Sequence, residues 1–114
     1  MKKTVLDGSI PFCLNCGGLV KPSIIFFGEN LPLRYFHLQE NDSREADLLL
    51  CIGTSLEVFP FAGLADLVTE NATRILINRE AVGSFGERKL DIIIKGDIVK
   101  EITSVMANLE KSAP

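Results

Sequence analysis

The sequence lacks an excess of charge of either sign and lacks long apolar runs. Its 12 Lys and Arg residues face 15 Asp and Glu, the formal net charge is −3, and the basic residues form no block. This balance argues against electrostatically driven binding to nucleic acid or to anionic membranes. The longest apolar runs, such as 48–52, are far shorter than the roughly 20 residues of a membrane-spanning helix. We therefore expect neither nucleic acid nor a membrane as a direct partner.

Cysteine is also scarce, with three residues in the chain. An odd number, two of them in a Cys-x-x-Cys pair, suits metal or redox chemistry in a reducing compartment better than a disulfide framework. Asp7, Gly8 and Pro11 interrupt the apolar stretch that would make the first residues a signal peptide. The sequence thus predicts an intracellular protein, cytoplasmic or nuclear.

The chain has the composition of one globular domain, with 114 residues, 46% of them hydrophobic and 24% charged. Strand-like runs at 24–27, 47–54, 74–78 and 90–94 alternate with helix-like stretches at 33–44, 60–70 and 97–109. The continuous apolar run in 47–54 predicts a strand buried on both faces. Alternation of this kind predicts an α/β fold with a Rossmann-like parallel sheet and flanking helices.

Cys13 and Cys16 are followed by Gly17 and Gly18, an arrangement typical of a zinc knuckle, in which a tight turn lets two thiolates share one ion. A redox dithiol and a pair of ordinary thiols are the alternatives. A structural zinc needs four ligands. Cys51 lies within a predicted strand and His37 on a predicted helix, so neither is placed to complete the site; we expect Cys51 in the core and His37 on the surface.

Polar residues follow two of the predicted strands. The segment Gly53-Thr54-Ser55 follows the run 48–52, and Asn78 and Glu80 come at the end of the next strand. Parallel α/β folds bind ligands at the carboxyl ends of their strands, where amides and hydroxyls hold phosphate and an acidic residue holds ribose. Ordinary strand exits and solvated loops are the alternative reading of both segments.

Several of these stretches together resemble one family. They are Cys-x-x-Cys-Gly-Gly-Leu-Val-Lys-Pro at 13–22, Ile-Phe-Phe-Gly-Glu-Asn-Leu-Pro at 25–32, Ala-Asp-Leu at 46–48, Gly-Thr-Ser-Leu at 53–56, Val-Phe-Pro at 58–60, Ile-Asn-Arg-Glu at 77–80 and Gly-Asp at 96–97. Their order and spacing resemble the C-terminal part of the sirtuins, the NAD-dependent protein-lysine deacylases, over nearly the whole chain. The resemblance implies a fragment of an enzyme that transfers the acyl group of acyl-lysine to the ADP-ribose of NAD and releases nicotinamide.

The resemblance also implies roles for individual residues. The carbonyl of Ile25 would accept a hydrogen bond from the acyl-lysine amide, and Phe27 would pack on the acyl chain. Gly28, Glu29 and the stretch around Val58 would form the two edges between which a substrate peptide adds as a strand. The implied NAD contacts are Gly53, Thr54, Ser55, Asn78, Glu80, Asp97 and Ile98. The implied zinc ligands are Cys13 and Cys16, two of the family's four.

The chain departs from the sirtuin pattern upstream, because the Gly-Ala-Gly-x-Ser loop, the catalytic His-Gly and the first Cys-x-x-Cys do not occur in it. We therefore expect no catalytic residue here, and His37 falls where the family has a variable helix. Residues 1–23 would be a partial zinc module, and 24–114 the C-terminal half of the NAD-binding domain. The alternatives are a non-catalytic NAD- or peptide-binding module that acts with another chain, and a plain structural domain. Self-association through an exposed sheet edge or a shared zinc is a further expectation.

Overall fold

The computed structural model describes residues 2–112, and the chain divides into two compact units at the junction of Pro32 and Leu33. The first unit holds one short helix, α1 (Lys2–Leu6), followed by irregular chain. The second unit holds the sheet and the remaining helices. Among the described residues, no helix has both the length and the apolar character needed to cross a bilayer.

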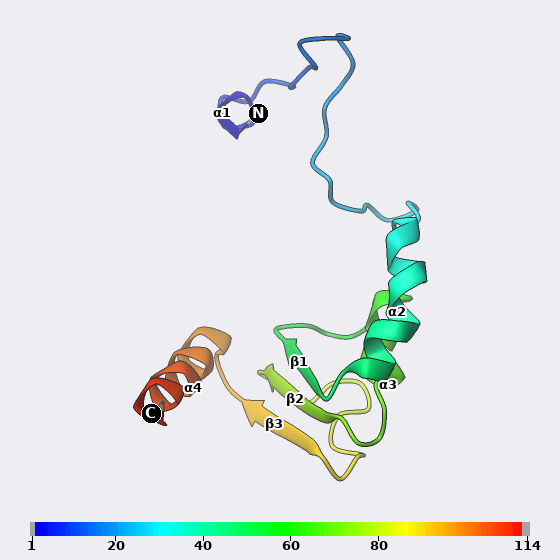
Figure 1. Ribbon diagram of the computed structural model, residues 1–114. Coiled ribbons are helices and arrows are strands. Elements are labelled where there is room, and N and C mark those ends of the chain that lie inside the picture. Colours follow the sequence, from blue (N-terminus) through cyan, green and yellow to red (C-terminus); the bar gives the residue numbers. More distant parts are fainter. Residues whose placement is uncertain (1, 113–114) are drawn as a thin grey trace. The chain divides into compact units, whose positions relative to one another are not determined.

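The second unit is built on a three-stranded sheet whose strands are parallel, as the sequence predicts. The strands β1 (Leu48–Ile52), β2 (Thr73–Asn78) and β3 (Asp91–Lys95) lie in the order β1-β2-β3 (Figure 1). Leu50 pairs with Ile75, and Ile75 pairs with Ile92. β2 is the most buried strand because it is central, with Leu76 completely buried. The α/β fold is therefore confirmed.

Four helical elements accompany this sheet in the described part of the chain. α2 (Leu33–Glu45) follows Pro32, η1 (Phe61–Gly63) and α3 (Leu64–Leu67) lie in the crossover from β1 to β2, and α4 (Ile98–Ser112) follows β3. Figure 1 shows α2 and α3 on one side of the strands and α4 starting where β3 ends. The hydroxyl of Tyr35 on α2 donates to the carbonyl of Pro60 at 3.0 Å and so ties α2 to the crossover.

The crossover helix is shorter than the predicted 60–70, because arginine side chains take the carbonyls at its end. Arg74 donates to the carbonyl of Ala65 at 2.9 Å, and Arg88 donates to those of Asp66 and Val68 at 2.9 and 2.8 Å. The last carbonyls of a helix need partners that the helix itself cannot supply. Val68 turns to extended backbone directly after α3.

Two predictions about strands are wrong. Residues 24–27 form no strand; the N–H of Phe26 donates to the carboxylate of Glu29 at 3.0 Å and is thereby lost to any strand ladder. β1 is only half-buried, and on one face: Leu49 and Cys51 pack against the core, whereas Leu48, Leu50 and Ile52 on the other face are exposed. The side chain of Leu50 is 55% exposed.

A small apolar core and a buried ionic cluster hold the second unit together. The core consists of Ala65, Leu76 and Phe85, with Leu49, Cys51, Leu56, Val82 and Ile93 packed against it. Beside it, the guanidinium of Arg74 is fully buried and holds both carboxylate oxygens of Asp91 at 2.7 Å. This pairing keeps the pKa of Asp91 well below its usual range. The cluster therefore fixes β2 to β3 by side chains as well as by the strand ladder.

Candidate functional site

The carboxyl edge of the sheet carries a cavity of about 430 Å³, here called the polar cavity. Residues that follow all three strands line it, because parallel strands end at the same edge. The lining residues are Gly53, Thr54, Ser55, Asn78, Arg79, Glu80, Val82, Asp97 and Ile98. The structure thus brings together all seven residues that the resemblance implies as NAD contacts. It adds Arg79 and Val82, which the sequence analysis missed.

Gly53 makes the turn from β1 into the polar cavity. Its φ of +61° lies in the left-handed region, and a Cβ at this position would come within 3.2 Å of Cδ1 of Ile98. Its N–H donates to the carbonyl of Ile77 at 3.0 Å, which extends the strand ladder up to the turn. Glycine therefore suits this position both for its backbone conformation and for the close approach of α4.

Asn78, the last residue of β2, connects the segment that follows β1 to the segment that follows β2. Its side-chain amide donates to the carbonyl of Thr54 at 3.0 Å and to that of Glu80 at 3.1 Å. Its own carbonyl accepts from the N–H of Gly96 at 3.0 Å. Asn78 thus holds together, at the rim of the polar cavity, the segments that follow β1, β2 and β3.

Asp97 caps α4, at the start of the predicted helical stretch 97–109. Its carboxylate accepts from the N–H groups of Val99 and Lys100 at 3.1 and 3.3 Å. Arg79 lies 3.8 Å from the same carboxylate and is largely exposed. The first amides of α4 are therefore engaged by Asp97, and the Gly53 N–H by Ile77, so the backbone amides that could meet an anion here are those of Thr54 and Ser55.

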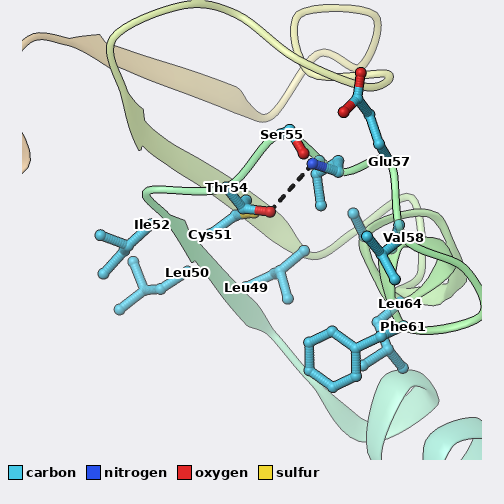
Figure 2. A pocket seen from close by; sticks show the side chains of 13 residues that line it. Leu49, Leu50, Cys51, Ile52, Thr54, Ser55, Glu57, Val58, Phe61 and Leu64 are labelled. Atoms are coloured by element: carbon cyan, nitrogen blue, oxygen red, sulfur yellow. Dashed lines mark hydrogen bonds between the residues drawn. The ribbon is translucent and has the colours of Figure 1, made fainter. Parts of the chain in front are cut away.

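A second, apolar pocket of about 560 Å³ lies beside β1 and is called the apolar pocket here. It is lined by Leu49, Leu50, Cys51, Ile52, Thr54, Ser55, Leu56, Glu57, Val58, Phe61, Ala62, Leu64 and Ala65. Figure 2 shows Leu49 on the side of β1 that faces Val58 and Phe61, and Leu50 and Ile52 on the other side of the strand. The N–H of Leu56 donates to the hydroxyl of Thr54 at 3.1 Å. Thr54 and Ser55 line both cavities, so one loop forms the wall between them.

The residues implied for substrate contact are divided between the two units. Val58 lies in the second unit and is exposed, whereas Ile25, Phe27, Gly28 and Glu29 lie in the first. In the first unit a turn runs from Phe26 to Glu29, closed by the Glu29 N–H donating to the Phe26 carbonyl at 3.0 Å. Gly28 has a φ of +86°, the value that a type II turn requires at its third residue. Phe27, at the tip of this turn, is 95% exposed.

Cys13 and Cys16 lie on a tight loop of the first unit. An antiparallel bridge joins Phe12 to Leu19, and the Cys13 N–H donates to the Gly18 carbonyl at 2.8 Å. Hydrogen bonds from the backbone of Cys16 and of Asn15 lower the pKa of the Cys13 thiol. Amides directed at a sulfur favour its thiolate form, which is the form that binds a metal. In residues 2–112, no three His, Cys, Asp or Glu side chains are grouped as metal ligands.

The other two candidate side chains lie where the sequence analysis expects them. Cys51 packs against the core, and burial raises the pKa of its thiol. His37 is exposed on α2.

Comparison with known proteins identifies the family. The Sir2 family model matches residues 1–60, which is more than half of the chain, so the chain belongs to the Sir2 family and the resemblance to sirtuins is confirmed. The NAD-dependent protein deacetylase hst2 of Schizosaccharomyces pombe is 45% identical over 105 residues, covering 92% of this chain and 32% of hst2. The NAD-dependent protein deacetylase sirtuin-3 of Mus musculus is 48% identical over 97 residues, covering 83% of this chain and 29% of sirtuin-3.

Solved structures agree with this assignment. The structure described as Sir2Tm bound to a propionylated peptide superposes with a TM-score of 0.71 and 27% identity, over 94% of this chain and 45% of that one. A structure described as Sir2 bound to acetylated peptide gives the same TM-score and identity over 94% and 44%. The chain spans about a third of the length of the curated relatives and less than half of the solved chains.

Proposed function

We propose that this chain supplies part of the NAD site and part of the substrate site of an NAD-dependent protein-lysine deacylase. The observation that carries the proposal is the convergence of residues from three strand ends on the polar cavity. The names of its relatives, which are NAD-dependent protein deacetylases, support it. In the complete reaction the acyl group passes from acyl-lysine to the ADP-ribose of NAD, and nicotinamide is released.

The donors and acceptors of the polar cavity fit a dinucleotide. The turn at Gly53 to Ser55 offers backbone amides and two hydroxyls for phosphate and ribose, and Glu80 offers a carboxylate for ribose hydroxyls. The approach of Ile98 to Gly53 provides an apolar wall, against which we place the adenine together with Asp97. Asp97 occupies the first amides of α4, which favours the Gly53 turn for the phosphates.

The substrate would be a peptide that carries an acylated lysine. Ile25 and Phe27 are apolar and exposed at the turn of the first unit, which suits contact with an acyl chain. Gly28, Glu29 and Val58 would flank the peptide backbone. Recognition by backbone pairing of this kind tolerates many peptide sequences. The related structures with propionylated and acetylated peptides support this substrate class.

Zinc would bind at Cys13 and Cys16, which supply two of the four ligands of a tetrahedral site. The amides near the Cys13 sulfur fit a thiolate ligand. We place residues 1–23 in this zinc module and the rest in the NAD-binding domain. The cysteines also favour an intracellular location.

No histidine lines the polar cavity in the described residues, so we expect no deacylase turnover from this chain alone. The alternative, a non-catalytic binding module that acts with another chain, shares the NAD site and differs in turnover. Turnover by the pure chain that is lost with Ser55→Ala would contradict the non-catalytic reading.

Titration of the isotopically labelled chain with NAD, followed by NMR, tests the site itself. We expect shifts at the amides of 53–55, 78–80 and 97–98, with a dissociation constant weaker than about 10 μM because only part of the site is present. Ser55→Ala and Glu80→Ala should weaken binding, while Ser104→Ala on the exposed face of α4 should not. Shifts confined to other residues, or none at all, would contradict the proposed NAD site.

A further inference from the structure

The side chain of Lys21 holds the turn that carries Phe27 through three contacts. Nζ of Lys21 lies 3.2 Å from Oε2 of Glu29 and donates to the carbonyl of Ile24 at 3.0 Å. The same ammonium lies 4.9 Å from the ring centroid of Phe26, within cation–π distance. One side chain thus contacts the beginning, the middle and the end of the segment 24–29.

Glu29 closes the turn twice. Its N–H donates to the carbonyl of Phe26, and its carboxylate accepts from the N–H of Phe26, each at 3.0 Å. Oε2 is the atom that takes both the Phe26 N–H and the Lys21 ammonium. The carboxylate is therefore turned back onto its own backbone, a different role from the direct peptide contact that the resemblance implies for Glu29.

The segment needs such a clamp because little else orders it. Ile25 and Phe26 are about half exposed, Phe27 almost fully, and no strand pairing holds residues 24–27. Charge-assisted hydrogen bonds are stronger than neutral ones, and here two of them share one carboxylate oxygen. Loss of the Lys21 ammonium would remove three of the contacts together.

We propose that Lys21 and Glu29 are positioning residues that hold the 24–29 segment in the conformation in which Ile25 and Phe27 are presented to an acyl-lysine side chain. The inference rests on the proposed function for the identity of the ligand. The clamp itself rests on contacts within the first unit. Glu29 acts through the Phe26 amide, and Lys21 acts through Glu29 and the Ile24 carbonyl.

The first arm of the test measures the clamp without any ligand. The Phe26 amide shift should follow ionisation of the Glu29 carboxylate, whose pKa the Phe26 N–H and Lys21 hold below its ordinary value. Because the folded-state pKa is depressed, the clamp is present above the ordinary carboxylate range and is lost as the pH falls through the folded-state pKa. Lys21→Met should move the midpoint upward, Lys21→Arg should restore it, and Glu29→Gln should abolish it. An unchanged midpoint in Lys21→Met would overturn the proposal.

The second arm measures binding of an Nε-acetyl-lysine peptide by NMR, with the unacetylated peptide as the control ligand. Lys21→Met and Glu29→Ala should each raise the dissociation constant about fivefold to tenfold. Lys21→Arg, and Lys3→Met as a charge-matched control in the same unit, should leave it unchanged. Equal affinity of the unchanged chain and Lys21→Met would overturn the positioning role. Absence of acetyl-peptide binding by the unchanged chain would overturn the substrate part and the proposed function, while the first arm would still decide whether the clamp exists.

Discussion

The guanidinium of Arg74 is fully buried and donates to groups from α3, the segment around Ser84 and β3. It donates to both carboxylate oxygens of Asp91, to the carbonyl of Ala65 and to the carboxylate of Asp66. It also donates to the hydroxyl and the carbonyl of Ser84. It also lies 4.8 Å from the ring centroid of Phe85. Removal of the guanidinium would leave the Asp91 carboxylate, which is 1% exposed, buried without its cation.

Arg74→Met should therefore lower the free energy of unfolding by about 3–5 kcal/mol, because the Asp91 carboxylate stays buried without its cation. Urea denaturation followed by circular dichroism measures the change. Arg79→Met removes the same charge from a side chain that is 83% exposed and should cost little. A loss of stability in Arg74→Met no larger than that in Arg79→Met would contradict the structural role of the cluster.

Gly53→Ala tests the turn into the polar cavity. A positive φ is costly for a residue with a Cβ, and here that atom would also press on Ile98, so we expect a loss of about 1–2 kcal/mol and weaker NAD binding. Gly63→Ala is the matched control, because its φ is −64° and its Cβ would meet Phe59 at an ordinary distance of 3.6 Å. Thermal unfolding and NAD titration of both variants measure the effects. Equal behaviour of the two variants would show that the Gly53 turn tolerates a side chain.

At the level of elements, the sheet was predictable from local pattern. The predicted runs at 47–54, 74–78 and 90–94 are short and β-rich, and each contains or forms most of a strand. The polar cavity was predictable for a topological reason, because parallel strands place their exits at one edge. Arg79, inside the motif at 77–80, and Val82, just after it, were missed because neither carries a recognisable pattern of its own.

Other features depend on tertiary contacts that a local pattern does not contain. The end of α3 is set by Arg74 and Arg88, which reach it from later in the chain. Arg74 begins a strand-like run and gives no sign in the sequence that its charge is buried. The open face of β1 depends on which elements pack against the strand, and the turn at 26–29 follows from the carboxylate of Glu29.

At the scale of the whole molecule, the exposed face and open edge of β1 predict self-association. Leu48, Leu50 and Ile52 are between 41% and 55% exposed on an uncharged edge strand of the described sheet. Sedimentation velocity at several concentrations should show association, and Leu50→Lys should weaken it by about tenfold or more. Val99→Lys, on a residue of α4 that is 70% exposed, is the matched control.

The same experiment with a chelator separates the sheet edge from a zinc shared between Cys13 and Cys16 of two copies. Association through β1 should persist in the chelator and in Cys13→Ser. Association through zinc should disappear in both, because ligand binding to the associated state stabilises it by mass action. A monomer at all concentrations would contradict both modes.

The buried position of Arg74 should also affect the rates of amide hydrogen exchange. The guanidinium must leave the Asp91 carboxylate when β2 separates from β3, and it ties the carbonyls of Ala65 and Ser84 to the same central strand. Amide hydrogens of β2, β3 and the segment around Ser84 should therefore exchange with solvent in a single slow step, while those of the open β1 edge and the turn at 26–29 exchange early. Amide hydrogen exchange would then be slowest in the middle of the sheet and fastest in the loop proposed to contact the substrate.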